Sequence, residues 1–429
     1  MAPSFKKEWF VPLLSLALFL FYCWGILLVP FHPDESTQIY MSGDFSQYLK
    51  NPFTLAVSPG VELTQDVIYR ALDAPITRYL IGIARGITNT PKLPVDWNWK
   101  LDWQNNQSAG AFPDPSLLLV SRFIPVLLLP LSINLLYFAL RKILSQGSAV
   151  IAVLYLGLNP LLLLHGRRAM AESALLFGIT LFLWAVTRKK VNPILVGLSL
   201  AVAFNAKQTA AVLIPAGIIA VCLIEQESRN LKNLLTRTCL FLVVFLAICI
   251  LLNPFYWKSP ILAISISVQA REQLSHLQLI DHLGGVKPSP LALFYELLNN
   301  LFMSPPIPLE LGYYSALQDS PIQEYFSIPP HSWGRGLFAG SMFITISLGG
   351  IIVLVKRFRS YIDDKKRILT NLIFITLLLI GGIIFTLPIP WQRYIIPLLP
   401  LSAFWFAYGC LPFIDFANHI FMTLKGDLS

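Results

Sequence analysis

The chain has 429 residues, of which 55% are hydrophobic and only 13% are charged, and its mean hydropathy is +0.64. Soluble domains carry about 25% charged residues, so this composition excludes an ordinary soluble domain and predicts a polytopic membrane protein. The net charge of +9 comes from short Lys and Arg clusters between apolar segments, which is a topology signal and not a nucleic-acid footprint.

The apolar segments predict the fold class. A spanning helix needs roughly 20 mostly apolar residues. The segments that fit are 10–30, 117–139, 148–164, 171–187, 192–205, 209–224, 238–256, 337–355, 369–387 and 394–413. We therefore expect an all-α bundle of about ten transmembrane helices in a single domain, 1–413, followed by a short cytoplasmic tail, 414–429. The first segment is expected to be a retained anchor, because no small-residue cleavage site follows it.

Basic clusters predict the orientation of these helices. They fall on one side of the ten-helix arrangement, which the positive-inside rule makes cytoplasmic together with both termini. The clusters are Lys6-Lys7, Arg141-Lys142, Arg188–Lys190, Arg229/Lys232/Arg237, Lys356–Arg367 and Lys425. In a bacterium the membrane would be the plasma (inner) membrane, with the opposite side periplasmic.

Two long loops, 31–116 and 257–336, fall on the external side. The second contains a predicted amphipathic helix at 261–280, and such helices with nearby aromatic residues tend to lie in the membrane interface. Two interpretations stay open: the loops rest on the bilayer, or they form a lid over a cleft.

Unusual charged residues gather at this external face. Asp34 and Glu35 follow the first segment, and His165, Arg167, Arg168 and Glu172 surround the turn before the fourth. Lys207 interrupts apolar sequence between the fifth and sixth segments, and Arg393 precedes the tenth. Any one of these could be an ordinary loop or snorkelling residue. Their shared membrane level indicates a reaction centre.

This set of charges suits a substrate with an anionic head and an apolar tail, such as a polyprenyl-phosphate sugar. The phosphate is a good leaving group, and Lys207 with Arg393, or the Arg167/Arg168 pair, could stabilise it as charge builds. A carboxylate must then accept the proton of the attacking acceptor hydroxyl, and Asp34 is the candidate base. A single displacement would invert the anomeric configuration, as in inverting glycosidases.

Five motifs in order carry a family resemblance. They are Asp34-Glu35, Asp73-Ala74-Pro75-Ile76-Thr77-Arg78-Tyr79-Leu80, Arg168 with Glu172, Gly197-Leu198 through Lys207-Gln208-Thr209, and Arg393-Tyr394-Ile395-Ile396-Pro397-Leu398. The ordered set resembles the GT-C glycosyltransferases, close to the protein O-mannosyltransferase and lipid A aminoarabinose transferase branch. The chain departs from that pattern at Asp73, where the family often has a basic residue or His, and Arg78 is a candidate substitute.

The resemblance implies a hexosyl- or pentosyltransferase with an undecaprenyl- or dolichyl-phosphate sugar donor. The acceptor, whether protein, lipid or glycan, is left open. Asp34, Glu35 and Glu172 become the expected catalytic residues, and Lys207, Arg393, Arg168 and Arg78 the expected phosphate-binding residues.

Asp34, Glu172 and His165 could also ligate a divalent metal, although the histidines lack metal-ligand spacing. The alternatives from other classes are a secondary transporter, which lacks support from an internal repeat, and a non-catalytic membrane assembly factor on the same fold.

Overall fold

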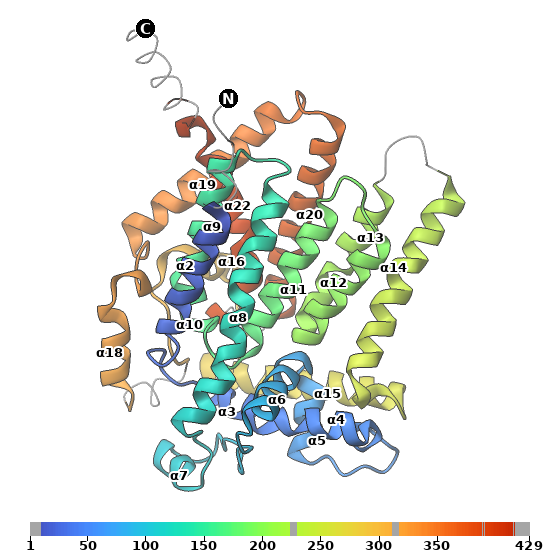
Figure 1. The fold of residues 1–429 in the computed structure, drawn as a ribbon, viewed down its shortest axis with the longest axis vertical. Helices are drawn as coiled ribbons and strands as arrows, with labels where there is room; N and C mark the ends of the chain where they lie inside the picture. The colour runs from blue at the N-terminus through green and yellow to red at the C-terminus, as the bar shows by residue number, and fades with distance from the viewer. Residues whose placement is uncertain are drawn as a thin grey trace.

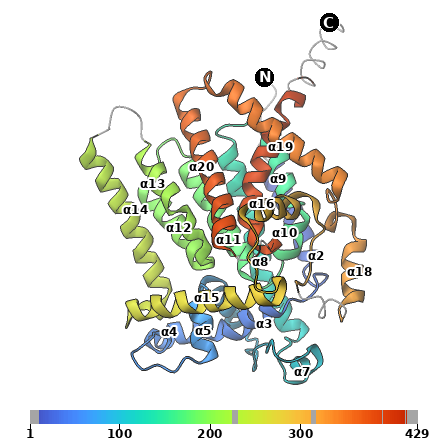
Figure 2. The same ribbon diagram turned by 180° about the vertical axis from the view of Figure 1, so that it is seen from behind.

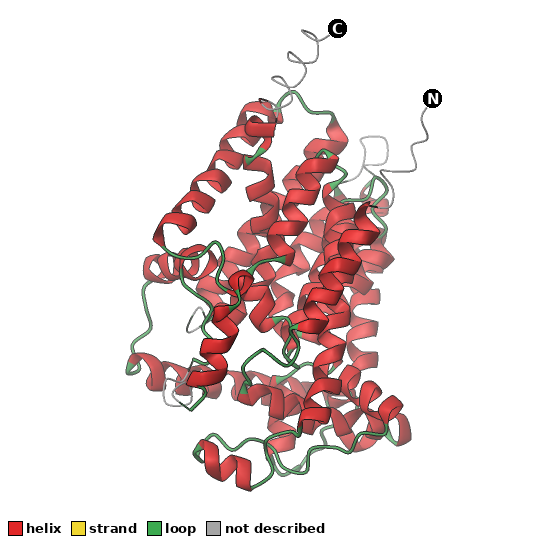
Figure 3. Cartoon of the chain, turned by 60° about the vertical axis from the view of Figure 1, so that its left-hand side comes forward, coloured by secondary structure: helices red, strands yellow, loops and turns green. Residues whose placement is uncertain are grey.

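A computed structural model describes residues 10–223, 230–310, 317–387, 389, 391–414 and 416. Within these residues the chain forms helices and turns and no strand (Figure 3). The predicted all-α class is therefore confirmed. The basic residues Lys6, Lys7, Arg229 and Lys425, and most of the predicted tail 414–429, lie outside the described residues.

A bundle of apolar helices forms the upper part of the molecule (Figure 1). Its helices are α2 (Phe10–Trp24), α8 (Pro115–Leu140), α9 (Gln146–Gly157), α11 (Ala171–Val186), α12 (Pro193–Ala206), α13 (Ile214–Cys222), α14 (Leu231–Leu252), α19 (Leu337–Phe358), α20 (Asp363–Thr386), α21 (Gln392–Ile395) and α22 (Leu399–Gly409). In the described part of the chain, five segments are long and apolar enough to cross a membrane, and five shorter apolar helices match the other predicted segments. The number that actually spans stays a prediction.

Helix α11 lies at the centre of the bundle and is buried along most of its length, including the phenyl ring of Phe182. Its close packing against α12 depends on Gly178. A Cβ atom there would lie 2.5 Å from the Cα of Ala203, closer than real Cβ contacts allow. This packing fixes the start of α11 beside the end of α12, where Glu172 and Lys207 lie.

The predicted external loops fold into a helical layer at one end of the bundle. The first loop supplies α3 (Pro33–Tyr40), α4 (Asp44–Lys50), α5 (Gln65–Leu72), α6 (Ile76–Thr88) and α7 (Trp103–Ser108). From the second loop, α15 (Pro260–Leu283) joins this layer, whereas α16 (Pro290–Leu298) and α18 (Asp319–Ser327) lie alongside the bundle. Figure 2 shows α15 running across the end of the bundle beside α4 and α5. The helix predicted at 261–280 is thus confirmed.

The two loops share a small apolar core, in which Ala71 and Val57 of the first pack with Ala263 and Ile266 of the second. This contact closes the end of the bundle with ordered helices. Those basic clusters that the structure describes lie at the other end. Arg367 donates to the carbonyl of Arg188 at 2.9 Å there.

Candidate active site

The first turn of α3 presents the two acidic residues identified in the sequence. His32 caps the helix, and its ring nitrogen accepts the backbone N–H of Asp34 at 3.1 Å. Pro33 occupies the first helical position, where a missing N–H has no cost. Asp34 and Glu35 follow, and negative charge is favourable at a helix N-terminus. The local sequence therefore fixes both carboxyl groups at one helix end.

Glu35 is fully buried, and its carboxylate is saturated with donors. Arg122 of α8 grips it through two parallel bonds of 2.7 Å, from Nε and Nη2. The backbone N–H groups of His32 and Ala169 add bonds of 3.0 and 2.9 Å. Burial by itself would raise the pKa of Glu35, but Arg122 outweighs it, so the pKa is lowered. Glu35 joins three segments and has no free lone pair to offer a substrate.

Asp34 has a different environment, because its side chain remains 33% exposed and forms an ion pair with Arg393. Burial would raise the pKa of its carboxyl, but the charges of Arg393 and His32 prevail and lower it. Asp34 is therefore an ionised, accessible carboxylate held by one cation that a ligand could take over.

Glu310 completes a network around Arg393. Its carboxylate forms an ion pair with Arg393, with Oε1 3.3 Å from Nε, and Oε2 lies 2.9 Å from His32 Nε2. Burial opposes ionisation of Glu310, yet Arg393 and His32 hold its pKa well below the usual range. The Arg393 guanidinium also lies over the rings of Trp391 and Tyr394, at 5.0 and 5.4 Å from their centroids. Arg393 is thus clamped between two carboxylates and two aromatic rings.

Lys207 and Glu172 form the second ion pair of the site, with Nζ and Oε1 2.9 Å apart. Glu172 is buried, whereas the Lys207 side chain is 20% exposed. The ammonium lies 4.6 Å from the ring centroid of Tyr394, which also contacts Arg393. One aromatic ring therefore links the two cations that the sequence singled out.

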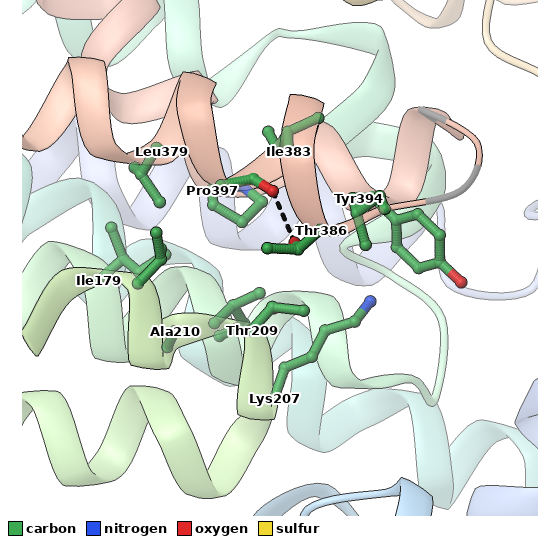
Figure 4. A pocket seen from close by; sticks show the side chains of 13 residues that line it. Ile179, Lys207, Thr209, Ala210, Leu379, Ile383, Thr386, Tyr394 and Pro397 are labelled. Atoms are coloured by element: carbon green, nitrogen blue, oxygen red, sulfur yellow. Dashed lines mark hydrogen bonds between the residues drawn. The ribbon is translucent and has the colours of Figure 1, made fainter. Parts of the chain in front are cut away.

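An apolar groove inside the bundle ends at Lys207. Its lining includes Ile179 of α11, Leu379 and Ile383 of α20, and Tyr394. Figure 4 shows Ile179 and Leu379 at one end of this groove and the tips of Lys207 and Tyr394 at the other. The groove thus joins an apolar interior to a cation.

Two further arginines predicted to bind phosphate are buried and have protein partners. Arg168 donates to the carbonyls of Pro30 and Pro308, the latter at 2.7 Å. Arg78 lies 3.2 Å from an oxygen of Asp44 and donates to the Asp73 carbonyl at 2.9 Å. In this structure both side chains hold loop segments together, and neither opens onto the groove. Their role in phosphate binding stays a prediction.

The candidate metal ligands are not assembled into a metal site. Asp34 is paired with Arg393 and Glu172 with Lys207, and His165 is buried away from solvent. Across the described residues, no group of three or more His, Cys, Asp or Glu side chains could hold a metal ion. Binding of a divalent metal by these residues stays a prediction.

Three residues of the site are not among those predicted from the sequence: Glu310, Arg122 and Tyr394. Arg122 had a signal, since it is a lone charge inside the apolar run of the second predicted span. Tyr394 was read only as part of a motif. Glu310 had no signal, because a single acidic residue after a Pro-rich loop is common.

Comparisons with known proteins bear on the family and the fold of this chain. Residues 116–257 match the model of the dolichyl-phosphate-mannose-protein mannosyltransferase family. No curated protein matches the sequence. Among solved structures, the apo oligosaccharyltransferase of Archaeoglobus fulgidus is 15% identical with a TM-score of 0.53, covering 100% of this chain and 53% of that protein.

Two other similar structures align less closely. The same archaeal enzyme with Zn and sulfate is 14% identical, with a TM-score of 0.49 over 94% of this chain and 50% of that one. The Saccharomyces cerevisiae protein O-mannosyltransferase Pmt1-Pmt2 complex, bound to the sugar donor, is 14% identical, with a TM-score of 0.39 over 61% and 34%.

The chain spans about half the length of the archaeal protein. The likeness to that protein shows the fold, and the family model adds a sequence match over the central helices. The sequence match over residues 116–257 is to a mannosyltransferase family, as the predicted resemblance implies.

Proposed function

We propose that this chain transfers a sugar from a polyprenyl-phosphate donor, undecaprenyl or dolichyl, to an acceptor hydroxyl on the external face of the membrane. The observation that carries the proposal is the apolar groove ending at Lys207, next to the Asp34–Arg393 pair. Such a site matches a substrate that has an apolar tail, a phosphate and a reacting carbon in that order. The family matched by residues 116–257 is described by a dolichyl-phosphate donor, which supports this substrate class.

The donor is oriented by the groove. Its prenyl chain would lie against Ile179, Leu379 and Ile383, since transfer of apolar surface from water is favourable. Its phosphate would then meet Lys207 at the end of the groove and Arg393 beyond Tyr394. Fixed cations at the leaving group stabilise the charge that builds there in the transition state.

Asp34 is the proposed base. Without a substrate, Arg393 holds its pKa down, which makes the carboxylate a weak proton acceptor. A donor phosphate that competes for Arg393 would release Asp34 and raise its basicity as the donor arrives. The freed carboxylate accepts the proton of the acceptor hydroxyl. The oxygen of that hydroxyl attacks the anomeric carbon, and the bond between this carbon and the phosphate oxygen breaks. One displacement of this kind inverts the configuration.

The other two acidic residues support this reaction from a distance. Glu35 positions α3 and therefore Asp34, through Arg122 and Ala169. Glu172 orients Lys207. The proposed steps use these side chains alone, and none of them passes through a metal.

Mass analysis of polyprenyl-phosphate sugars and surface glycans, with and without the gene, tests the proposal. Loss of the gene should deplete one glycan and leave its lipid-phosphate sugar unused, and restoring the gene should reverse both changes. If the glycans and lipid-linked sugars are the same in both strains, the proposal fails. If the lipid-linked sugar instead accumulates on the cytoplasmic side, the chain is a transporter.

A further inference from the structure

The turn between α5 and α6 is held in place next to the proposed site, although the mechanism above does not use it. Three side chains from separate elements donate to its backbone carbonyls: Gln208 to Ala71 at 3.2 Å, Arg271 to Leu72 at 2.7 Å and Arg78 to Asp73 at 2.9 Å. Gln208 directly follows Lys207, so the turn is fastened to the end of the lipid groove.

Asp73 is the acidic residue that this turn presents. Gln38 of α3 donates to its Oδ2 at 3.3 Å, and within the described residues no other hydrogen bond reaches the carboxylate, which leaves Oδ1 free. The nearby charges are those of Arg271, Asp34, Arg78 and Lys207. Burial, with the like charge of Asp34, raises the pKa of Asp73. The turn therefore holds a second carboxylate near both Asp34 and Lys207, and burial disfavours its charge.

The direction of the groove determines which part of a bound donor would lie next to the Asp73 carboxylate. The prenyl chain occupies the apolar end, so the phosphate lies at Lys207 and the sugar lies beyond it, toward Asp34. A carboxylate in that place repels a phosphate, but forms strong charge-assisted hydrogen bonds with the hydroxyl groups of a sugar. The nearby cations do not fully neutralise the Asp73 carboxylate, because each of them already binds a carbonyl or another carboxylate. They are Arg271, Arg78 and Lys207.

We propose that Asp73 is the residue that recognises the donor sugar, accepting hydrogen bonds from the hydroxyls of an uncharged pyranose through its free oxygen. This inference rests on the proposed function and deepens it by naming the sugar subsite. It makes a further claim, because the same carboxylate disfavours a sugar that carries its own carboxylate, such as a hexuronic acid.

The test compares two lipids on the purified full-length protein: decaprenyl phosphate alone, and decaprenyl phosphate carrying mannose, glucose or galactose. Asp73→Asn removes the charge while its amide oxygen still accepts from Gln38, so the turn should be kept. Asp73→Ser serves as a second variant of smaller volume. Asp66→Asn is the matched control, since Asp66 lies on α5, which leads into this turn, and is 41% exposed. Its contacts are a loose ion pair with Arg70 at 3.8 Å and a hydrogen bond that it accepts from Tyr40 at 3.3 Å. Thermal midpoints verify that all variants are folded.

The expected result is about a tenfold loss of affinity for the best of the sugar-bearing lipids in both Asp73 variants. Affinity for decaprenyl phosphate alone should stay within about twofold, and Asp66→Asn should change neither. An equal loss for both lipids, or no loss for either, overturns the sugar contact. If the wild-type protein binds neither lipid, the proposed function itself fails and this inference with it.

Discussion

Glu35→Gln is expected to destabilise the fold, although Glu35 is adjacent to the proposed base. The Glu35 and Arg122 side chains are 0% and 1% exposed and joined by two bonds of 2.7 Å. A glutamine can accept from Arg122 with only one of its two terminal atoms, and its NH₂ group would face another donor. The change therefore leaves a buried guanidinium without its counter-charge.

The size of this effect follows from burial. Removing one partner of a buried ion pair typically costs about 3–5 kcal/mol, because the remaining charge stays desolvated. The N–H of Ala169, now 2.9 Å from Glu35 Oε2, would also lose its acceptor wherever the amide nitrogen takes that place. At roughly 2–4 °C per kcal/mol for a large domain, the apparent midpoint of unfolding should fall by about 10 °C.

The assay is thermal unfolding in detergent at one fixed heating rate, because membrane proteins of this size commonly unfold irreversibly. Glu62→Gln is the matched control, an exposed glutamate of the same loop, and should leave the midpoint unchanged. Arg122→Gln should destabilise similarly, and the double variant should lose less than the sum of the two. If Glu35→Gln unfolds like the wild type but loses transfer, Glu35 reacts directly and the positioning role is wrong.

Three further predictions concern the donor site and the orientation. Lys207→Ala is made in a Glu172→Gln background, which avoids an unpaired buried carboxylate. It should weaken binding of decaprenyl phosphate at least tenfold, with or without a sugar, because it removes a charge-assisted contact. Unchanged affinity in a direct binding assay would exclude Lys207 from the phosphate site. Thr386 is an exposed residue in the groove lining. Thr386→Trp should weaken binding of a decaprenyl-phosphate sugar but not of its two-isoprene citronellyl analogue. Equal effects on both lipids would mean that the prenyl chain lies outside the groove. In a cysteine-free background, Lys100→Cys should react with a membrane-impermeant thiol reagent on intact cells, and Asn230→Cys should not. Reversed labelling would overturn the predicted orientation.

The helices and the site differ in how far the sequence could predict them. Apolar segments are long and locally encoded, so each predicted segment has a helix in the structure. The alternation of basic clusters also predicts Asp34, Lys207 and Arg393 at one end. These charges stand out because charge within apolar, membrane-spanning sequence is rare and costly. Hydropathy therefore determined which residues could meet.

The ion pairs within the site could not be predicted from the sequence. Asp34 and Arg393 are separated by 359 positions, and nothing in either motif names the partner of the other. The two members of the acidic pair also looked equivalent, yet helix geometry turns Glu35 toward Arg122 in the interior and Asp34 toward the groove end. The two loop carbonyls that accept from the Arg168 guanidinium lie in segments far from it in the sequence, so its motif does not predict these contacts.

The transfer reaction of Asp34→Asn tests the central claim most directly. The purified protein, the lipid-phosphate sugar and the acceptor identified from the glycan analysis would be combined, and transfer rate, donor affinity and thermal midpoint measured together. General-base catalysis contributes typically 10²–10⁴-fold, so transfer should fall by that factor. Donor affinity should be kept or increased, because Arg393 loses its competing carboxylate, and the midpoint should remain near that of the wild type. Transfer at the wild-type rate in a folded, donor-binding Asp34→Asn protein would contradict the account.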